Sequence, residues 1–418
     1  MENSGALITN DAIVFGILAL ILGGVFWTSS FERGFFKIFY RIFPPLLLCY
    51  FVPSLFTTFG FFDPEQSSIY FVASRYLLPA ALVLLTLSAD LPATFRLGPK
   101  ALIMFFTGTL GVMIGGPLAL MVASMIDPGL IDGADSPAAV WRGMATVAGS
   151  WIGGGANQTA IFEIFEVDAS VFSAWIAVDV IVANIWMAIL LYIAANPSGI
   201  DKRLKSDVSA IDHLRVKAEE FEQKTARPPQ LTDLMYILAI GFGAVALAHI
   251  VADSLAPWIA ETYPGLARYS LTSGFFWLIV VATTLGVGLS FTRLRNLQAA
   301  GAMKIGRVFI YILVAAIGMR MDITAIFDNP EYFLIGLFWV AIHAVLLITM
   351  AVLIRAPMFF MAVGSQANIG GAASAPVVAA AFHPALAPVG VLLAVLGYIV
   401  GTYGAYITGL IMQAISGG

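Results

Sequence analysis

Two stretches decide the fold: Gly149-Ser150-Trp151-Ile152-Gly153-Gly154-Gly155-Ala156-Asn157-Gln158-Thr159 and Gly364-Ser365-Gln366-Ala367-Asn368-Ile369-Gly370-Gly371-Ala372-Ala373-Ser374. Each interrupts a long apolar region at a matching place in one half of the 418-residue chain. Backbone rich in glycine and amides is tolerated at membrane depth only where protein or a water-filled cavity satisfies its open N–H and C=O groups. A matched pair of such breaks is typical of a secondary transporter, whose binding site they form.

The composition is that of a membrane protein. Hydrophobic residues make up 60% of the chain and charged residues 11%, and the mean hydropathy of +0.92 lies far outside the soluble globular range. The apolar runs are long enough for helices to cross a hydrocarbon core of ~30 Å, and the alternation typical of a transmembrane barrel is not seen. We therefore expect an all-α membrane protein in contact with the lipid bilayer, with no nucleic-acid partner.

Several chemistries are excluded by the residues that the chain lacks. The single cysteine, Cys49, cannot form a disulfide framework, and the four histidines have no ligand spacing such as H-x-x-x-H. No H-E-x-x-H motif is present, and no serine–histidine pairing lies near Ser150 or Ser365. We expect no resident cofactor and no enzymatic activity.

Ten apolar runs predict membrane-spanning helices. They cover 11–29, 42–60, 68–89, 100–126 and 168–195 in the first half, and 234–252, 272–290, 304–325, 333–355 and 388–416 in the second. A glycine-rich element lies between the fourth and fifth predicted helices of each half, near 139–166 and 356–386. This pattern divides the chain into a first repeat, 1–195, a polar cytoplasmic linker, 196–233, and a second repeat, 234–418.

Basic residues set the orientation of these helices, because cytoplasmic loops are enriched in Lys and Arg. The linker and the segments after the first and third helices carry such residues: Arg33, Lys37, Arg41, Arg96, Lys100 and Lys202. The segment after the fourth helix instead carries Asp127, Asp132 and Asp135 without Lys or Arg, so we expect it outside. Both chain termini are then predicted to lie on the outer side of the membrane, opposite the cytoplasm.

The same reasoning makes each glycine-rich element a re-entrant hairpin. An odd number of crossings leads from the acidic outer segment to the basic linker, yet the interval holds one full helix and the glycine-rich element. Five crossings per half give the second half the opposite topology, which makes the chain an inverted repeat. Arg75 and Asp90 match Arg307 and Asp322 at one constant offset of 232 residues (307 − 75 and 322 − 90), which supports the repeat.

The two hairpins are the predicted solute site. N-terminal helix ends favour an anion such as a carboxylate, and glycine lets the backbone approach it. The residues assigned to the solute are Ser150, Trp151, Gly154, Gly155, Asn157, Gln158, Ser365, Gln366, Asn368, Gly370 and Gly371. The alternative is that the small residues only permit close helix packing, but packing does not explain the clustered amides, which are costly to bury unpaired. Trp151 is a candidate for solute stacking and equally for packing.

Asp179 is an acid in the middle of the fifth predicted helix, and an intramembrane acid is a functional candidate by default. The residues assigned to a coupling cation at the hairpin tips are Asp179, Asn157, Thr159, Asn368 and Ser374. Sodium is preferred over a proton because the site is richer in neutral oxygen ligands than in titratable groups. A structural hydrogen bond is the alternative role for Asp179.

Other polar residues of the apolar regions leave their roles open. Glu163 is either a second acid at the site or lies near the outer mouth of the first hairpin. Four arginines could pair with an acid or a solute carboxylate, or could snorkel to the interface: Arg75, Arg142, Arg307 and Arg320. His343 is expected to be a packing histidine, and Tyr398 and Thr402 are polar candidates facing the hairpins.

The two glycine-rich motifs, together with the Tyr-x-x-Gly-Thr-Tyr run at 398–403, resemble an integral membrane family known as domain of unknown function number 819. The similarity covers nearly the whole chain. That family is similar in layout to sodium-coupled glutamate and citrate-type symporters with paired hairpins. The resemblance implies an elevator mechanism, in which a core domain carrying both hairpins slides against a scaffold. It further implies a homodimer, the cytoplasmic (inner) membrane of a bacterium, and amino acids or small cell-wall peptides as solutes.

The leading hypothesis is therefore a sodium-coupled symporter for a small anionic or zwitterionic solute, such as an amino acid, a carboxylate or a small peptide. The alternative is a proton-coupled transporter or a cation/proton antiporter that uses Asp179. A channel fits less well, because two opposed hairpins suit alternating access.

Overall fold

The computed structural model describes residues 7–31, 33–43, 45–64, 67–195, 197–204, 228–320, 329–383 and 386–417. Apart from one β-bridge between Ile8 and Phe62, these residues form helices joined by turns and loops. The predicted all-α class is confirmed. The linker residues 205–227 and the repeat partner Asp322 lie outside the described residues.

The first half contains α1 (Asp11–Ser29), α2 (Phe35–Ile42), α3 (Pro45–Thr58), α4 (Ile69–Val72), the π-helical turn η1 (Ala73–Leu77), α5 (Leu78–Leu87), α6 (Leu91–Phe95), α7 (Pro99–Ile126), α8 (Val140–Gly153), α9 (Gly155–Ile164) and α10 (Ala169–Ala195). After α11 (Pro197–Leu204), the second half contains α13 (Leu231–Thr262), α14 (Gly274–Ser290), η4 (Arg293–Gln298), α15 (Ala302–Gly318), α17 (Glu331–Leu353), α18 (Met358–Ile369), α19 (Gly371–Phe382) and α20 (Ala387–Ile415).

Within the described residues, seven helices are long and apolar enough to cross a membrane: α1, the continuous α4–α5, α7, α10, α13, α17 and α20. The helices α3 and α14 are shorter and apolar, and α15 has 17 residues. Each of the ten predicted runs coincides with one of these helices. The boundaries differ most at α13 and α15. α13 begins at Leu231, inside the predicted linker, and ends at Thr262 rather than at 252, and α15 ends at Gly318, before the end of the predicted run.

Each glycine-rich element is a pair of short helices. α8 and α9 have 14 and 10 residues, and α18 and α19 have 12 each, whereas a spanning helix needs ~20. The chain turns at Gly154 (φ +77°) and near Gly371 (φ +55°), where a side chain would be strained. A Cβ at Gly149 of α8 would lie 2.9 Å from the carbonyl oxygen of Asn157 in α9, so the two helices fold back on each other.

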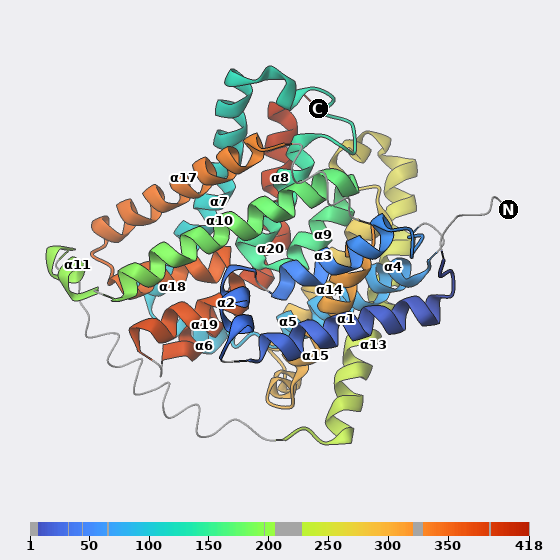
Figure 1. Cartoon of the computed structure of the whole chain (residues 1–418), viewed down its shortest axis with the longest axis horizontal. Coiled ribbons are helices and arrows are strands. Elements are labelled where there is room, and N and C mark those ends of the chain that lie inside the picture. The colour runs from blue at the N-terminus through green and yellow to red at the C-terminus, as the bar shows by residue number, and fades with distance from the viewer. Residues whose placement is uncertain are drawn as a thin grey trace.

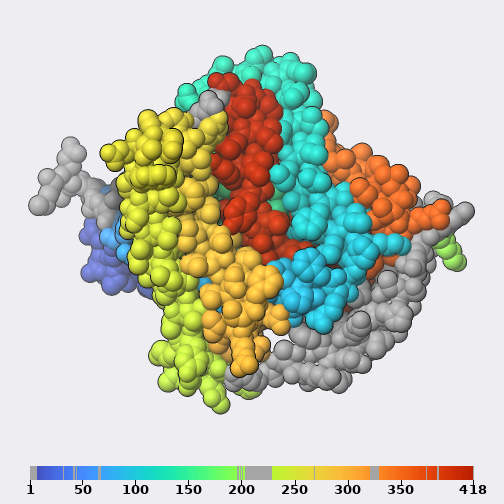
Figure 2. Space-filling model, turned by 180° about the vertical axis from the view of Figure 1, so that it is seen from behind, coloured from blue at the N-terminus to red at the C-terminus, as the bar shows by residue number. Residues whose placement is uncertain are grey.

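The helices pack into two groups. The flanking group consists of α1, α3, α4–α5 and α13–α15, and the hairpin group consists of α7–α10 and α17–α20. Figure 1 shows α7, α17 and α18 toward one side of the molecule and α1, α13 and α15 toward the other. On the opposite face, Figure 2 shows α20 between α13–α14 and α7. α20 packs mainly on α8, α19, α7 and α18 and also touches α5 and α14, so it lies at the boundary between the groups.

Glycines let α20 approach the first hairpin closely. A Cβ at Gly397 would lie 2.5 Å from the carbonyl oxygen of Ile152, and a Cβ at Gly401 would lie 2.7 Å from the Cα of Gly153. Such contacts between small residues are a common way for helices to associate in membranes. The tip of the first hairpin is therefore held against α20 by backbone contact.

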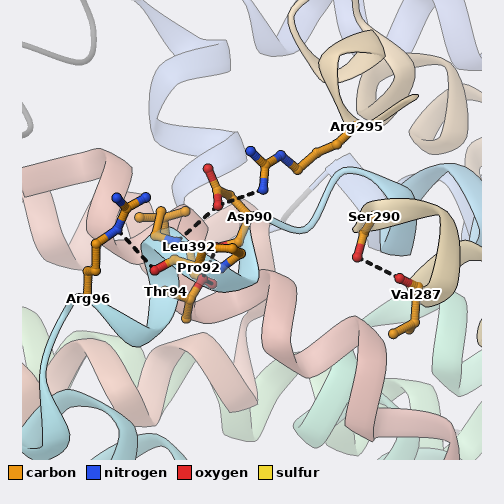
Figure 3. A network of polar contacts seen from close by, with 9 residues as sticks. Asp90, Pro92, Thr94, Arg96, Val287, Ser290, Arg295 and Leu392 are labelled. Atoms are coloured by element: carbon orange, nitrogen blue, oxygen red, sulfur yellow. Dashed lines mark hydrogen bonds and ion pairs between the residues drawn. The ribbon is translucent and has the colours of Figure 1, made fainter. Parts of the chain in front are cut away.

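A polar network joins the loop after α5 to η4 and α20 (Figure 3). Asp90 caps α6 by accepting from the Ala93 N–H (3.0 Å), and its Oδ1 also lies 3.1 Å from Nη1 of Arg295 in η4. The Thr94 hydroxyl donates to the Asp90 carbonyl at 2.8 Å and to the Leu392 carbonyl of α20 at 3.4 Å. One acid thus connects segments from both halves of the chain.

Adding a methyl group at Gly401 should destabilise the protein, because the added Cβ has no room beside Gly153 and Asn157. We expect Gly401→Ala to lower the free energy of unfolding by about 1–3 kcal/mol and to lower the thermal unfolding midpoint of detergent-purified protein. Gly243→Ala in α13 is the matched control, because nothing lies within 4 Å of its added Cβ. That variant should be neutral or slightly more stable. Equal midpoints for the two variants would contradict the close packing of α20.

Candidate functional site

Both helix breaks open onto one cavity of 260 Å³ at the boundary between the two groups. The hairpin group contributes residues of both breaks and of α10 and α20. The flanking group contributes Leu46 of α3, Leu85 of α5, and Arg307, Ile310 and Tyr311 of α15. The cavity is therefore lined by residues from both helix groups.

Four helix ends meet at this cavity. α8 and α18 end there, and α9 and α19 begin there. A Cβ at Gly371 would lie 3.8 Å from the Cα of Gly154, which is an ordinary van der Waals distance. The breaks of the two hairpins therefore lie next to each other. No side chain of the described residues caps the first turn of α9 or α19. Their open N–H groups and the partial positive charge of the helix ends favour an anion in the cavity.

Asp179 of α10 lines the cavity and is only 6% exposed. Trp151 Nε1–H donates to one carboxylate oxygen at 2.6 Å, and the Gln158 amide donates to the other at 3.0 Å. Both donors come from the first hairpin and both are neutral. Among the described residues no cation forms an ion pair with Asp179, so neutral donors alone hold this carboxyl group in place.

The second break presents an open acceptor. The Gln366 amide donates to the Ser374 hydroxyl at 2.6 Å, across the break between α18 and α19, and both residues line the cavity. Gln366 is 1% exposed, and its Oε1 has no hydrogen-bond partner among the described residues. A buried amide oxygen without a partner is costly, so a ligand that supplies a donor would be favoured here.

Arg307 reaches the cavity from α15. One guanidinium nitrogen donates to the carbonyl of Ala372, in the first turn of α19, at 3.3 Å, and to the Met303 sulfur at 3.7 Å. Within the described part of the chain, no carboxylate pairs with it. The sequence named Arg307 only as one of four arginines with open roles; its constant offset from Arg75 was the signal that could have singled it out. Asn184, Tyr311 and Tyr398 also line the cavity.

The two asparagines of the motifs are buried away from the cavity. Asn157 donates to the carbonyl four residues before it (2.8 Å) and accepts from Thr402 of α20 (2.5 Å). Asn368 donates to two carbonyls (2.9 Å each) and accepts from Thr109 of α7 (2.8 Å). In each asparagine the amide nitrogen donates a hydrogen bond and the amide oxygen accepts one, so both side chains join the hairpins to neighbouring helices.

The structure brings part of the predicted site together. Of the residues assigned to the solute, Ser150, Gly154, Gly155, Gln366, Gly370 and Gly371 line the cavity, and Trp151, Asn157, Gln158, Ser365 and Asn368 do not. Of those assigned to the cation, Asp179 and Ser374 line it, and Asn157, Thr159 and Asn368 do not. The Thr159 hydroxyl bonds to carbonyls of its own helix. The described residues contain no cluster of three or more His, Cys, Asp and Glu that could hold a metal ion.

Ser365 belongs to a separate hydrogen-bonded chain. Trp186 Nε1–H can only donate, and it donates to the Ser365 hydroxyl at 2.8 Å. Ser365 is then free to donate to His343 Nε2 (2.8 Å), while His343 Nδ1–H donates to the Gly108 carbonyl (3.0 Å). A neutral imidazole satisfies every partner, and this arrangement fits the packing role expected for His343. The expectation that no histidine pairs with Ser365 is wrong, because the fold brings His343, 22 residues earlier in the chain, to the Ser365 hydroxyl.

Glu163 lies in α9 and pairs with Arg75 of the π-helical turn at 3.3 Å. Its side chain is 9% exposed and that of Arg75 is 33% exposed. Arg142 donates to the carbonyls of Phe165 and Asp135, and Arg320 lies over the Tyr70 ring, 4.6 Å from its centre. None of these groups lines the cavity.

Comparison with known proteins places the chain in a family. Residues 16–415 match the family described as "Protein of unknown function (DUF819)", a range that includes every cavity residue. The uncharacterised membrane protein YjcL of Bacillus subtilis (strain 168) is 24% identical over 349 residues, which are 81% of this chain and 83% of that protein. The resemblance expected from the motifs is thereby confirmed, and this multi-pass membrane protein belongs to the DUF819 family.

Proposed function

We propose that the protein is a secondary active transporter that couples sodium to the movement of a small anionic or zwitterionic solute. The observation that carries this proposal is the cavity at the boundary of the two helix groups, into which both hairpin tips open. Discontinuous helices whose ends meet around one site are typical of secondary transporters. Amino acids, carboxylates and small peptides are the solutes that such a cavity suits.

The order of the helices supports an inverted repeat. In each half, three helices of the flanking group (α1, α3 and α4–α5, or α13, α14 and α15) precede one long helix (α7 or α17), a helical hairpin, and a last long helix (α10 or α20). Five crossings per half would give the two halves opposite orientations. The loops predicted outside and inside by their charges then alternate along the chain.

The two groups correspond to the parts of an elevator. In this proposal the hairpin group is the moving core and the flanking group is the scaffold, which also pairs with a second copy in a homodimer. Polar contacts that cross the boundary include Arg75 with Glu163 and Thr284 with Tyr403. Because these pairs join side chains on opposite sides of the boundary, sliding of one group past the other would exchange them for new partners.

The coupling cation is assigned to the tips of the hairpins. Asp179 supplies a carboxylate without a paired cation among the described residues, and Ser150, Gln366 and Ser374, which also line the cavity, carry neutral side-chain oxygens. Sodium suits such oxygen ligands. The second candidate is proton coupling or cation/proton antiport, because Asp179 is the one carboxylate among the described residues that line the cavity.

Sodium should stabilise the purified protein, because a ligand that binds the folded state raises its stability by mass action. We expect a higher thermal unfolding midpoint in sodium than in potassium or choline, and loss of this difference in Asp179→Asn. Trp151→Phe is the control, since it removes one hydrogen bond to Asp179 but keeps the carboxylate. A sodium effect that survives in Asp179→Asn would contradict the assignment. No cation effect together with a strong pH effect would favour proton coupling.

The proposed orientation can be tested with single cysteines. Native Cys49 is 0% exposed and should give little background. Ser136, in the turns before α8, and Asn296, in η4, are exposed positions that the charge pattern puts on opposite sides of the membrane. A membrane-impermeant maleimide added to intact cells should label Ser136→Cys and should label Asn296→Cys only after permeabilisation. Labelling of both variants in intact cells would contradict the inverted topology.

A further inference from the structure

Two arginines 232 residues apart (307 − 75) reach from the flanking group to the hairpins. Arg75, next to α5, contacts α9, the second helix of the first hairpin, through Glu163. Arg307 in α15 contacts α19, the second helix of the second hairpin, through the carbonyl of Ala372. The two side chains thus occupy corresponding places in the two halves.

Their partners differ in one respect. Arg75 has a protein carboxylate at 3.3 Å. The sequence of α19, Gly371–Phe382, contains no acidic residue, and Arg307 lines the cavity without a carboxylate partner among the described residues. A guanidinium group carries five donors in a planar fork, and a carboxylate is the partner that matches it best. The first half therefore contains an arginine–carboxylate pair, whereas the described residues of the second half supply the arginine without the carboxylate.

The surroundings of Arg307 limit what can complete the site. The open first turns of α9 and α19 add N–H donors that favour one anion. Gln366 Oε1 is a buried acceptor without a partner, so the ligand should also carry a donor. Among the described residues that line the cavity, Arg307 is the one basic residue, so a second anionic group of the ligand would have no basic partner there.

We propose that the solute is a monocarboxylate that carries a hydrogen-bond donor beside its carboxylate, and that Arg307 binds this carboxylate as Arg75 binds Glu163. This inference rests on the proposed transport function and narrows its substrate. The shared chemistry includes 2-amino acids, 2-hydroxy acids and the C-terminal residue of a small peptide. Leu46, Leu85 and Ile310 give the rest of the solute an apolar wall.

The test is a thermal unfolding titration of the purified full-length protein in sodium with a matched panel. L-alanine, L-lactate and L-alanyl-L-alanine represent the three sources; L-alaninamide lacks the carboxylate, propionate lacks the donor, and L-aspartate has a second carboxylate. We expect at least one of the first three compounds to raise the midpoint, propionate to bind at least tenfold more weakly, and the amide and aspartate to have no effect.

Two variants are compared on the same panel. Arg307→Gln should weaken binding of the effective carboxylate at least tenfold while keeping the sodium effect, which serves as evidence of correct folding. The double variant Arg75→Gln, Glu163→Gln neutralises the corresponding pair away from the cavity and should bind as the wild type does.

Three results would overturn the inference alone, provided that sodium still stabilises the protein. These are stabilisation by alaninamide equal to that by alanine, unchanged affinity in Arg307→Gln, and no effect of any of the three monocarboxylates. Absence of both the sodium effect and all solute effects in the wild type would instead count against the proposed function itself.

Discussion

Every backbone N–H and C=O group inside a bilayer needs a partner, because lipid offers none. The two helix breaks are the places where this requirement is hardest to meet, and much of the hairpin group is arranged around them. Asn157 and Asn368 bond carbonyls near the breaks, and Thr402 of α20 and Thr109 of α7 hold these amides in turn. The groups left open at the tips face a cavity, where a ligand or water can satisfy them.

The two hairpins use their polar residues differently. In the first, Trp151 and Gln158 hold the Asp179 carboxylate, and Glu163 pairs with Arg75. The second hairpin has no acid within its two helices, and its Gln366 oxygen has no partner among the described residues. Side chains of the first hairpin therefore bind the acid that lines the cavity, whereas the second hairpin brings an unpartnered amide oxygen to the same region.

The sequence predicted the fold better than the site. Span length and glycine breaks are local properties, so all ten apolar runs coincide with helices and both hairpins turn at the predicted glycines. The direction in which a buried amide points depends on its neighbours, and composition does not contain that information. Asn157 and Asn368 were therefore assigned to ligands, although both are bonded to protein at each end. Arg307 was not singled out because its partner on α19 is a backbone carbonyl, which leaves no mark in the sequence.

The cavity has walls from both helix groups, with Arg307 on one side and the hairpin tips on the other. A solute that touches both walls makes all of its contacts in only one relative position of the two groups. In the proposed elevator, the solute would have to release Arg307 and find another partner or water before the hairpin group could carry it elsewhere. The affinity for the solute would then depend on the position of the hairpin group. The measured affinity would equal the affinity of the arrangement described here multiplied by the fraction of molecules that adopt it.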